Sequence, residues 1–254
     1  MRGAPIARVH PAADAFRGVA ELYERTRPGY PEEAVAYLVS RLGLAPGRSV
    51  VDLAAGTGKL TRQLVPSGAR VIAVEPLPEM RAFLAQTAPA AEVLDGTAEA
   101  IPVADASVDA VTVAQAFHWF DAAGALAEIA RVVRPGGAAA LIWNIRELDD
   151  PLQARFHELL LPYRGETPNE HERPWLGAVA ASAAFGPVEA CSTPFIERMS
   201  RSDVSGRFAS VSFVAQLPED ERRQLLARID AVAAGLDEPV EFRYRTDVFV
   251  LPVR

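Results

Sequence analysis

The feature that most constrains the fold is the segment VVDLAAGTGKL at residues 50–60. Its apolar start predicts a short buried strand, which breaks at Gly56 and Gly58 and leads into a helix from about Lys59. The two glycines let the backbone turn sharply and approach a ligand where a Cβ would clash. The start of the helix offers free N–H groups to an anionic group. Taken alone, such a turn indicates nucleotide-binding α/β proteins in general.

Strand patterns alternate with helical patterns on both sides of this turn. The strands are expected at residues 49–54, 69–75, 91–95, 108–115 and 138–143. The helices are expected at residues 31–42, 59–67, 78–86 and 121–133, with Asp121 as the cap of the last one. Near-continuous apolar strands suit a parallel sheet that is covered on both faces. Alternation at this spacing predicts right-handed crossovers.

The pattern changes after residue 148. Helices are expected at residues 150–160 and 217–235, and further strands at residues 188–199 and 241–251. These strands are too few for a second domain, so we predict one domain over residues 1–254. The predicted fold is α/β, with a Rossmann-like, seven-stranded, mostly parallel sheet, helices on both faces and a small helical cap.

Composition excludes several classes of protein. The chain has 26 basic and 33 acidic residues, a net charge of −7, which argues against broad electrostatic binding of nucleic acid. Its one cysteine cannot form an internal disulfide, and no Cys/His cluster predicts a metal site. The N-terminus lacks the apolar run of a signal peptide, and no apolar stretch of roughly 18 residues predicts a membrane span. We therefore expect a cytoplasmic protein without a membrane partner; nothing in the sequence indicates an oligomeric state.

Two further loops are expected at the same edge of the sheet as the glycine turn. Glu75 ends the second strand 19 residues after Gly56, a spacing at which an acid accepts hydrogen bonds from ribose hydroxyls. The alternative is a solvated acid at a strand end. The loop at residues 95–102 follows the third strand, where backbone groups and Thr97 can meet an adenine ring. Ligands of open α/β sheets bind at this edge.

Five segments together resemble one family. They are VDLAAGTGKL, EPLPEM, GTAEAIP, DASVDAVTVAQAFHWF and VVRPGG, spread over residues 20–145. With them the chain resembles class I methyltransferases that use S-adenosylmethionine (SAM), in the small-molecule group that includes trans-aconitate and ubiquinone-pathway enzymes. The resemblance implies SAM as the cofactor and S-adenosylhomocysteine (SAH) as its product. It also suggests a lid and first helix at residues 1–45, a cofactor-binding core at 46–148, and cap helices with C-terminal strands at 149–254.

The resemblance also implies which residues bind the cofactor. By motif they are Asp52, Ala54, Gly56 and Gly58 at the methionine end, Glu75 at the ribose, Met80, Thr97, Ala98 and Glu99 around the adenine, and Ala114 and Gln115 beneath the sulfonium. Two of these positions depart from the family pattern. Ala54 stands where the family has its first glycine, and Thr97 stands where an aspartate is common, which weakens the expected contact with the adenine amine.

The stretch QAFHWF after the fourth strand bears on the methyl acceptor. It lacks the Asn/Asp-Pro-Pro-Tyr/Phe motif that amino-group methyltransferases of nucleic acids and proteins commonly carry, and it has no cysteine nucleophile. His118 stands where a base would deprotonate a hydroxyl or where an imidazole would hydrogen-bond a carboxylate substrate. The alternative is a histidine that only packs in the loop. Trp119 either walls the substrate pocket or packs under the following helix.

Other candidates flank the expected cofactor site. The run before the first predicted helix resembles the family's lid, with Tyr23 as a catalytic candidate over the methionine moiety and Arg27 and Tyr30 as substrate contacts. Solvated charges at a plain helical entry are the alternative. Trp143 and Arg146 follow the fifth strand and are substrate candidates, Arg146 for an acidic substrate.

The predicted function is transfer of a methyl group from SAM to a small organic acceptor, at oxygen, with carbon or nitrogen as alternatives. Since SAM is a strong electrophile, positioning in a dry pocket can supply most of the acceleration. One rival is a SAM-binding protein without catalysis. Another is a nicotinamide-dependent oxidoreductase, although Thr61 stands where its G-x-G-x-x-G/A motif needs a small residue. An RNA methyltransferase would need a basic stripe, for which the candidates are Arg198, Arg201, Arg207, Arg243 and Arg245.

Overall fold

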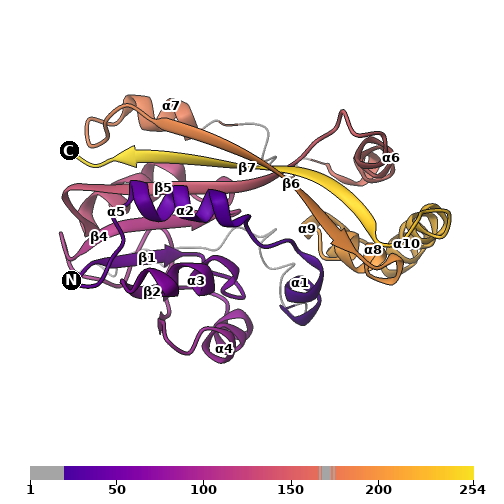
Figure 1. Cartoon of the computed structure of the whole chain (residues 1–254), viewed down its shortest axis with the longest axis horizontal. Helices are drawn as coiled ribbons and strands as arrows, with labels where there is room; N and C mark the ends of the chain where they lie inside the picture. Colours follow the sequence, from indigo (N-terminus) through magenta and orange to yellow (C-terminus); the bar gives the residue numbers. More distant parts are fainter. Residues whose placement is uncertain (1–19, 166, 168–172, 174) are drawn as a thin grey trace.

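A sheet of seven strands, in the order β3-β2-β1-β4-β5-β7-β6, forms the centre of the computed structural model (Figure 1). The model describes residues 20–165, 167, 173 and 175–254; the first 19 residues of the predicted lid lie outside these ranges. The strands are β1 (Ser49–Leu53), β2 (Arg70–Val74), β3 (Glu92–Leu94), β4 (Val108–Ala114), β5 (Val133–Arg146), β6 (Glu189–Met199) and β7 (Val240–Pro252). Strands β1 to β5 pair in parallel, and β7 pairs antiparallel with both β5 and β6. The predicted seven-stranded, mostly parallel sheet is confirmed.

Helices follow most of the strands. They are α1 (Ala20–Thr26), α2 (Glu32–Arg41), α3 (Lys59–Leu64), α4 (Pro78–Thr87), α5 (Ala122–Val132), α6 (Pro151–Leu160), α7 (Trp175–Ala181), α8 (Arg201–Ala209), α9 (Ser212–Ala215) and α10 (Glu219–Ala233). Asp121 caps α5, as predicted, by accepting a hydrogen bond from the amide of Gly124 at 3.2 Å. The sequence did not predict α7, α8 or α9, which have 7, 9 and 4 residues, too few turns for a clear helical period.

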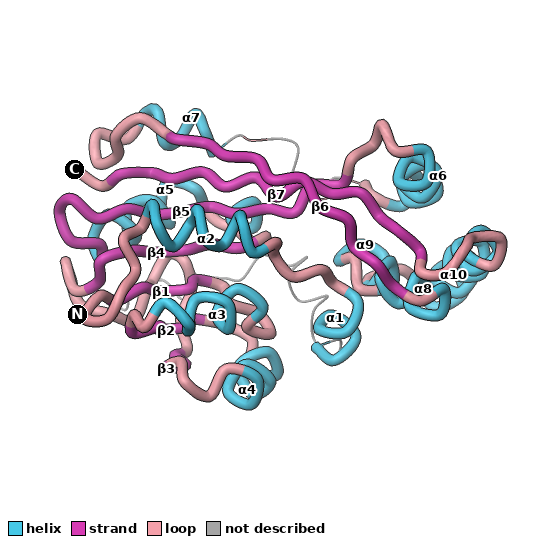
Figure 2. The backbone as a smooth tube through the Cα atoms, in the orientation of Figure 1, coloured by secondary structure: helices cyan, strands magenta, loops and turns pink. Residues whose placement is uncertain are grey.

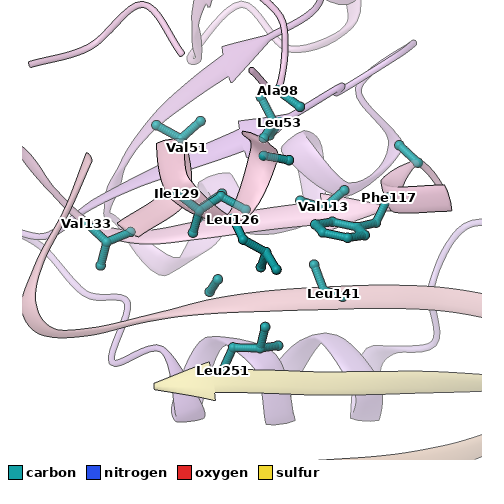
Figure 3. Packing of buried hydrophobic residues seen from close by; sticks show 14 of the residues in the cluster. Val51, Leu53, Ala98, Val113, Phe117, Leu126, Ile129, Val133, Leu141 and Leu251 are labelled. Atoms are coloured by element: carbon teal, nitrogen blue, oxygen red, sulfur yellow. The ribbon is translucent and has the colours of Figure 1, made fainter. Parts of the chain in front are cut away.

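The two faces of the sheet bury different sets of side chains. On β1, Val51 and Leu53 belong to the core cluster that includes Leu126 and Ile129 of α5, part of which is drawn in Figure 3. Val50 points to the opposite face and packs with residues of α2 and α3. This alternation follows from the two-residue period of a strand. Helices therefore cover both faces, as predicted.

The cap is built on an extension of β6 and β7 beyond the other strands (Figures 1 and 2). Helices α6, α8, α9 and α10 pack there in a separate cluster. At its centre, the ring of Phe156 lies 4.7 Å from that of Phe208 and 5.7 Å from that of Phe242, measured between centroids. The cap thus rests on the distal ends of two strands that reach it from the main sheet. The division into lid, core and cap segments stays a prediction.

The strand order reverses between β1 and β4, since β2 and β3 lie on one side of β1 and β4 and β5 on the other. Open α/β sheets bind ligands in the crevice outside the carboxyl ends of their strands at such a reversal. The loops at residues 54–58, 75–77, 95–99 and 115–120 follow β1, β2, β3 and β4 there. The fold therefore gathers the sequence motifs at one edge of the sheet.

None of the helices in the described ranges has both the length and the low polarity needed to cross a bilayer. The longest of them, α10, has 15 residues and begins with three acids.

Candidate functional site

Two cavities meet at the ends of β1 and β4. The apolar cavity, of about 120 Å³, is lined by Leu53, Glu75, Pro76, Leu77, Met80, Gly96, Thr97, Ala98, Glu99, Ala116 and Phe120. The polar cavity, of about 170 Å³, has among its lining residues Arg27, Tyr30, Thr57, Lys59, His118, Asn144, Arg146, His157, Arg164, Arg207, Phe208 and Ser212. Both are lined by Tyr23, Ala54, Gly56, Ala114, Gln115 and Trp119. The shared residues make the two cavities one continuous site.

The turn after β1 borders both cavities with a left-handed backbone. Ala54 and Gly56 have φ angles of 54° and 58°. Gly56 lines both cavities, and a Cβ built on it would meet no atom within 4 Å. Gly56 therefore leaves room for a ligand to approach the backbone, as the sequence predicts.

Glu75 joins this turn to the next loop. Its side chain accepts hydrogen bonds from the amides of Gly56 and Leu77, both at 2.9 Å, and the residue is 4% exposed. Burial raises the pKa of Glu75, while the two backbone hydrogen bonds oppose that rise. The carboxylate holds two ligand-facing loops together and borders the apolar cavity. Its contact with a ribose stays a prediction.

The loop after β3 provides the wall of the apolar cavity. The Oγ1 atom of Thr97 is buried there and has no hydrogen-bond partner among the residues that the structure describes. A buried hydroxyl without a partner costs free energy, which a ligand donor or acceptor would recover. Ala98 and Met80, 3% and 4% exposed, add apolar surface, and Glu99 completes the lining. This wall suits a flat, mostly apolar ring that carries polar edges.

Two predicted cofactor residues do not border either cavity. Asp52 is fully buried and accepts hydrogen bonds from Thr61 at 2.6 Å and from Thr112 at 3.0 Å. It ties β1 to α3 and β4, because alternation along the strand turns its side chain under α3. Gly58 has a φ of 85°, and a Cβ on it would lie 2.4 Å from a methyl group of Leu84. The space beside Gly58 is thus filled by α4 rather than open to the cavities; a cofactor contact of Asp52 or Gly58 stays a prediction.

His118 lines the polar cavity from a short 3-10 helix at residues Phe117–Trp119. Trp143 donates its indole N–H to His118 Nδ1 at 3.4 Å. An indole N–H can only donate, so a neutral imidazole in this bond carries its proton on Nε2. In this tautomer Nε2 carries a proton and cannot take one up, so His118 is better suited to donate a hydrogen bond than to act as the predicted base. Trp143 itself is 3% exposed, stacks on Trp175 with ring centroids 5.6 Å apart and lines neither cavity; its contact with a substrate stays a prediction.

The remaining predicted substrate residues lie at the polar cavity. Arg27 donates to the hydroxyl and the carbonyl of Ser210 at 2.9 and 2.7 Å, which joins the end of α1 to the end of α8. Its guanidinium lies 5.3 Å from the ring of Tyr23. Tyr30 is 8% exposed, and burial raises its pKa well above the ordinary value. Trp119 and Arg146 also line the site, Trp119 at the junction of the cavities.

Several lining residues were not predicted to contact the cofactor or a small acceptor. They are Lys59, Asn144, His157, Arg164 and Arg207. Asn144 donates to the carbonyl of Gly29 at 2.8 Å and accepts from Thr246 at 2.7 Å, so it fixes the approach to the site. His157 and Arg207 come from the cap helices α6 and α8, and no local motif indicates that these helices reach the cavity.

The arginines proposed for a basic stripe do not form one. Arg198 pairs with Glu241, Arg201 with Glu238, Arg243 with Asp150 and Arg245 with Glu147. The fifth, Arg207, is 6% exposed. Four of these arginines therefore have acidic partners and the fifth is buried; the absence of a nucleic acid partner stays a prediction.

Comparison with known proteins identifies the family. Residues 51–141 match a family model described as a methyltransferase domain. The chain is 44% identical over 133 residues to an uncharacterized methyltransferase of Mycobacterium tuberculosis, covering 52% of this chain and 53% of that protein. It is 33% identical over 233 residues to an uncharacterized methyltransferase-like protein of Schizosaccharomyces pombe, covering 89% and 91%.

Among solved structures, the chain resembles a putative type II methyltransferase from Anaeromyxobacter dehalogenans. The TM-score is 0.62 at 26% identity, over 90% of this chain and 97% of that one. The match to the mycobacterial relatives spans only about half of their length. The relative from Schizosaccharomyces pombe matches almost from end to end. Together with the fold and the loops gathered at its ligand edge, these matches show that the chain belongs to the class I SAM-dependent methyltransferases.

Proposed function

We propose that this chain binds SAM in the apolar cavity and transfers its methyl group to a small organic acceptor in the polar cavity, at oxygen. The observation that carries the proposal is the continuity of the two cavities at the glycine turn. A methyl donor in one cavity and an acceptor in the other would meet at the shared residues. SAM, when bound, supplies a methyl group that is already electrophilic.

The residues of the apolar cavity fit this cofactor. The open space at Gly56 admits a ligand close to the backbone, and the orphaned hydroxyl of Thr97 offers a hydrogen bond. Glu75 presents carboxylate lone pairs for ribose hydroxyls, and Met80 supplies an apolar surface for adenine. These residues would hold the adenosine, while Ala54 and Gly56 would border the methionine end.

The chain's own contribution to the reaction is positioning and exclusion of water. Residues of α1, α6 and α8 line the polar cavity together with the strand ends, so the acceptor would be enclosed between cap and sheet. His118, whose Nδ1 accepts from Trp143, would border the acceptor from the end of β4. Holding the acceptor in line with a strong electrophile in a dry pocket accounts for most of the expected acceleration. An enclosed cavity also favours a small molecule over a polymer.

The first test is calorimetric titration with SAH, with NAD as the control ligand. We expect saturable binding of SAH and no binding of NAD. Thr97→Val keeps the shape of the side chain and removes only the orphaned hydroxyl, so SAH affinity should fall about 3- to 10-fold without loss of stability. Glu75→Ala should weaken binding further, whereas Glu92→Ala, on the exposed end of β3, should not change it. Failure of the wild-type protein to bind SAH would refute the proposal.

The acceptor half needs a separate test. Incubation with labelled SAM and an extract separated into small molecules, RNA and protein should label the small-molecule fraction. Label in bulk RNA or protein and none in small molecules would overturn the acceptor class while leaving the cofactor in place.

A further inference from the structure

A buried arginine lines the polar cavity with no ion-pair partner among the described residues. Arg207 lies on α8 and is 6% exposed. Within the described residues, its guanidinium makes one hydrogen bond, from Nη2 to the hydroxyl of Tyr244 at 3.0 Å. Its Nε atom is buried and finds no hydrogen-bond partner in the described part of the chain. No ion pair joins Arg207 to a carboxylate in the described ranges, so its positive charge is left uncompensated at short range.

Such an arrangement is unfavourable unless something else completes it. A guanidinium stays charged at any pH at which the protein is folded, so it cannot relieve its burial by losing a proton. Buried charges in proteins are normally paired or fully hydrogen-bonded. The fork of N–H donors matches the oxygens of a carboxylate or a phosphate. A ligand anion would supply what the protein does not.

Other cations of the same cavity are already engaged inside the protein. Lys59 donates to the carbonyl of Glu24 at 2.7 Å and lies 3.6 Å from its carboxylate. Arg27 donates to Ser210. By contrast, none of the described lining residues is an aspartate or a glutamate, although acids outnumber basic residues in the chain by 33 to 26. The described lining of the cavity therefore includes basic side chains and no acidic one.

Glu197 on β6 is an acid whose pKa is affected by the charge of Arg207. Burial raises the pKa of Glu197, and the charges of Arg207 and Lys59 oppose that rise. Yet Glu197 forms no ion pair with Arg207 and does not line the cavity. It lowers the cost of burying the arginine without occupying its donors, so the donors stay available to a ligand.

We propose that Arg207 binds a carboxylate or phosphate group of the methyl acceptor and thereby selects small anionic acceptors. This inference rests on the proposed function and adds the substrate class to it. The cavity runs from Arg207 on α8 to Ala114 and Gln115 at the end of β4. The acceptor would be held by its anionic group at the cap, with its accepting atom toward the end of β4, where the two cavities meet.

The test measures stabilisation by simple anions, with and without SAH. The unfolding midpoint of the protein is followed during titration with inorganic phosphate, with succinate and with uncharged dimethyl succinate, at constant ionic strength. We expect a saturable rise of the midpoint with at least one of the two anions and none with the diester. A rise of the midpoint with phosphate indicates a phosphate group on the acceptor, and a rise with succinate indicates a carboxylate.

Variants separate binding from structure. Arg207→Met removes the buried charge at similar length, so its midpoint without anion should be higher than that of the wild type. Its apparent anion affinity should be at least about tenfold lower. Arg207→Lys keeps the charge but loses the fork, and should retain a weakened response. Arg201→Met, at the exposed start of the same helix, is the matched control and should respond like the wild type.

Two results would overturn the inference. One is a wild-type protein that binds SAH but responds to neither anion more than to the diester. The other is an Arg207→Met variant that keeps the full anion response. Either result leaves methyl transfer intact, because SAH binding is measured independently; absent SAH binding would instead remove the function on which the inference rests.

Discussion

The buried carboxyl of Asp52 makes a prediction about stability that can be worked through from the structure. The side chain is fully buried and accepts hydrogen bonds from the hydroxyls of Thr61 and Thr112. Within the described residues it forms no ion pair. Burial raises its pKa from 3.8 to about 6, although both hydroxyls favour the ionised form.

The sign of the effect follows from this direction. A carboxyl that ionises less readily in the folded state than in the unfolded state contributes stability that is complete below pH 3.8 and lost as the pH rises to about 6. A pKa difference of about two corresponds to about 3 kcal/mol. At neutral pH the folded protein therefore carries a cost of that order at Asp52.

Asp52→Asn removes this cost because an amide does not ionise. The amide oxygen can accept from Thr61, and the amide nitrogen can donate to Thr112, whose own hydroxyl lies 3.4 Å from the carbonyl of Val51. We expect the free energy of unfolding to increase by about 1.5 kcal/mol near pH 5 and by about 3 kcal/mol near pH 7. Urea unfolding, followed by tryptophan fluorescence at both pH values, measures these differences.

Asp109 provides a control with the opposite sign. Burial opposes its ionisation, but hydrogen bonds from Arg48 and Ser49 outweigh burial and lower its pKa to about 2. Its stabilising contribution is complete above about pH 4, so Asp109→Asn should lower stability equally near pH 5 and near pH 7. The reasoning fails if Asp52→Asn destabilises the protein at both pH values, or if its gain does not grow between them.

Three further substitutions test the backbone and the histidine. Ala54→Gly removes the strain of a left-handed alanine at a φ of 54° and should raise the free energy of unfolding by on the order of 1 kcal/mol. An unchanged midpoint of urea unfolding would show that the backbone of Ala54 is not strained. Gly58→Ala places a Cβ 2.4 Å from a leucine methyl on α4 and should cost roughly 1 to 3 kcal/mol more than Gly47→Ala, which has a φ of 88° but meets no atom within 4 Å. Equal losses in thermal unfolding would show that packing on α4 is not the constraint. Trp143→Phe removes the hydrogen-bond donor to His118 and should lower kcat/KM for the acceptor about 3- to 10-fold, while the affinity for SAH stays unchanged. An unaltered kcat/KM would show that this hydrogen bond does not contribute to the reaction.

The cofactor half of the site was predictable because each of its parts is local. A strand end, a glycine turn and an acid at the end of the next strand must meet when parallel strands share an edge. Nine of the eleven residues that the resemblance implied border the two cavities. The two exceptions are Asp52 and Gly58. Asp52 lies on the face of β1 that packs under α3, and Gly58 packs closely against Leu84 of α4.

The cap residues of the acceptor half were not predictable, because they reach the cavity through long-range contacts, whereas the predicted Tyr30, His118 and Arg146 do line it. Helix α8 has nine residues and little amphipathic pattern, so the sequence did not predict it. It reaches the cavity because β6 and β7 extend beyond the sheet and carry the cap (Figure 2). Arg207 is held there by Tyr244 of β7, 37 positions away along the chain.

This separation decides what the family match can say about the acceptor. The matched residues, 51–141, include the glycine turn, Glu75 and the loop after β3, so they describe the part that would bind the cofactor. Arg207 lies outside them, on an element that the cap positions. Relatives with the same core can therefore differ in acceptor if α8 carries a different residue at this point. The anion titration of the Arg207 variants measures the acceptor half directly, which similarity over the core cannot do.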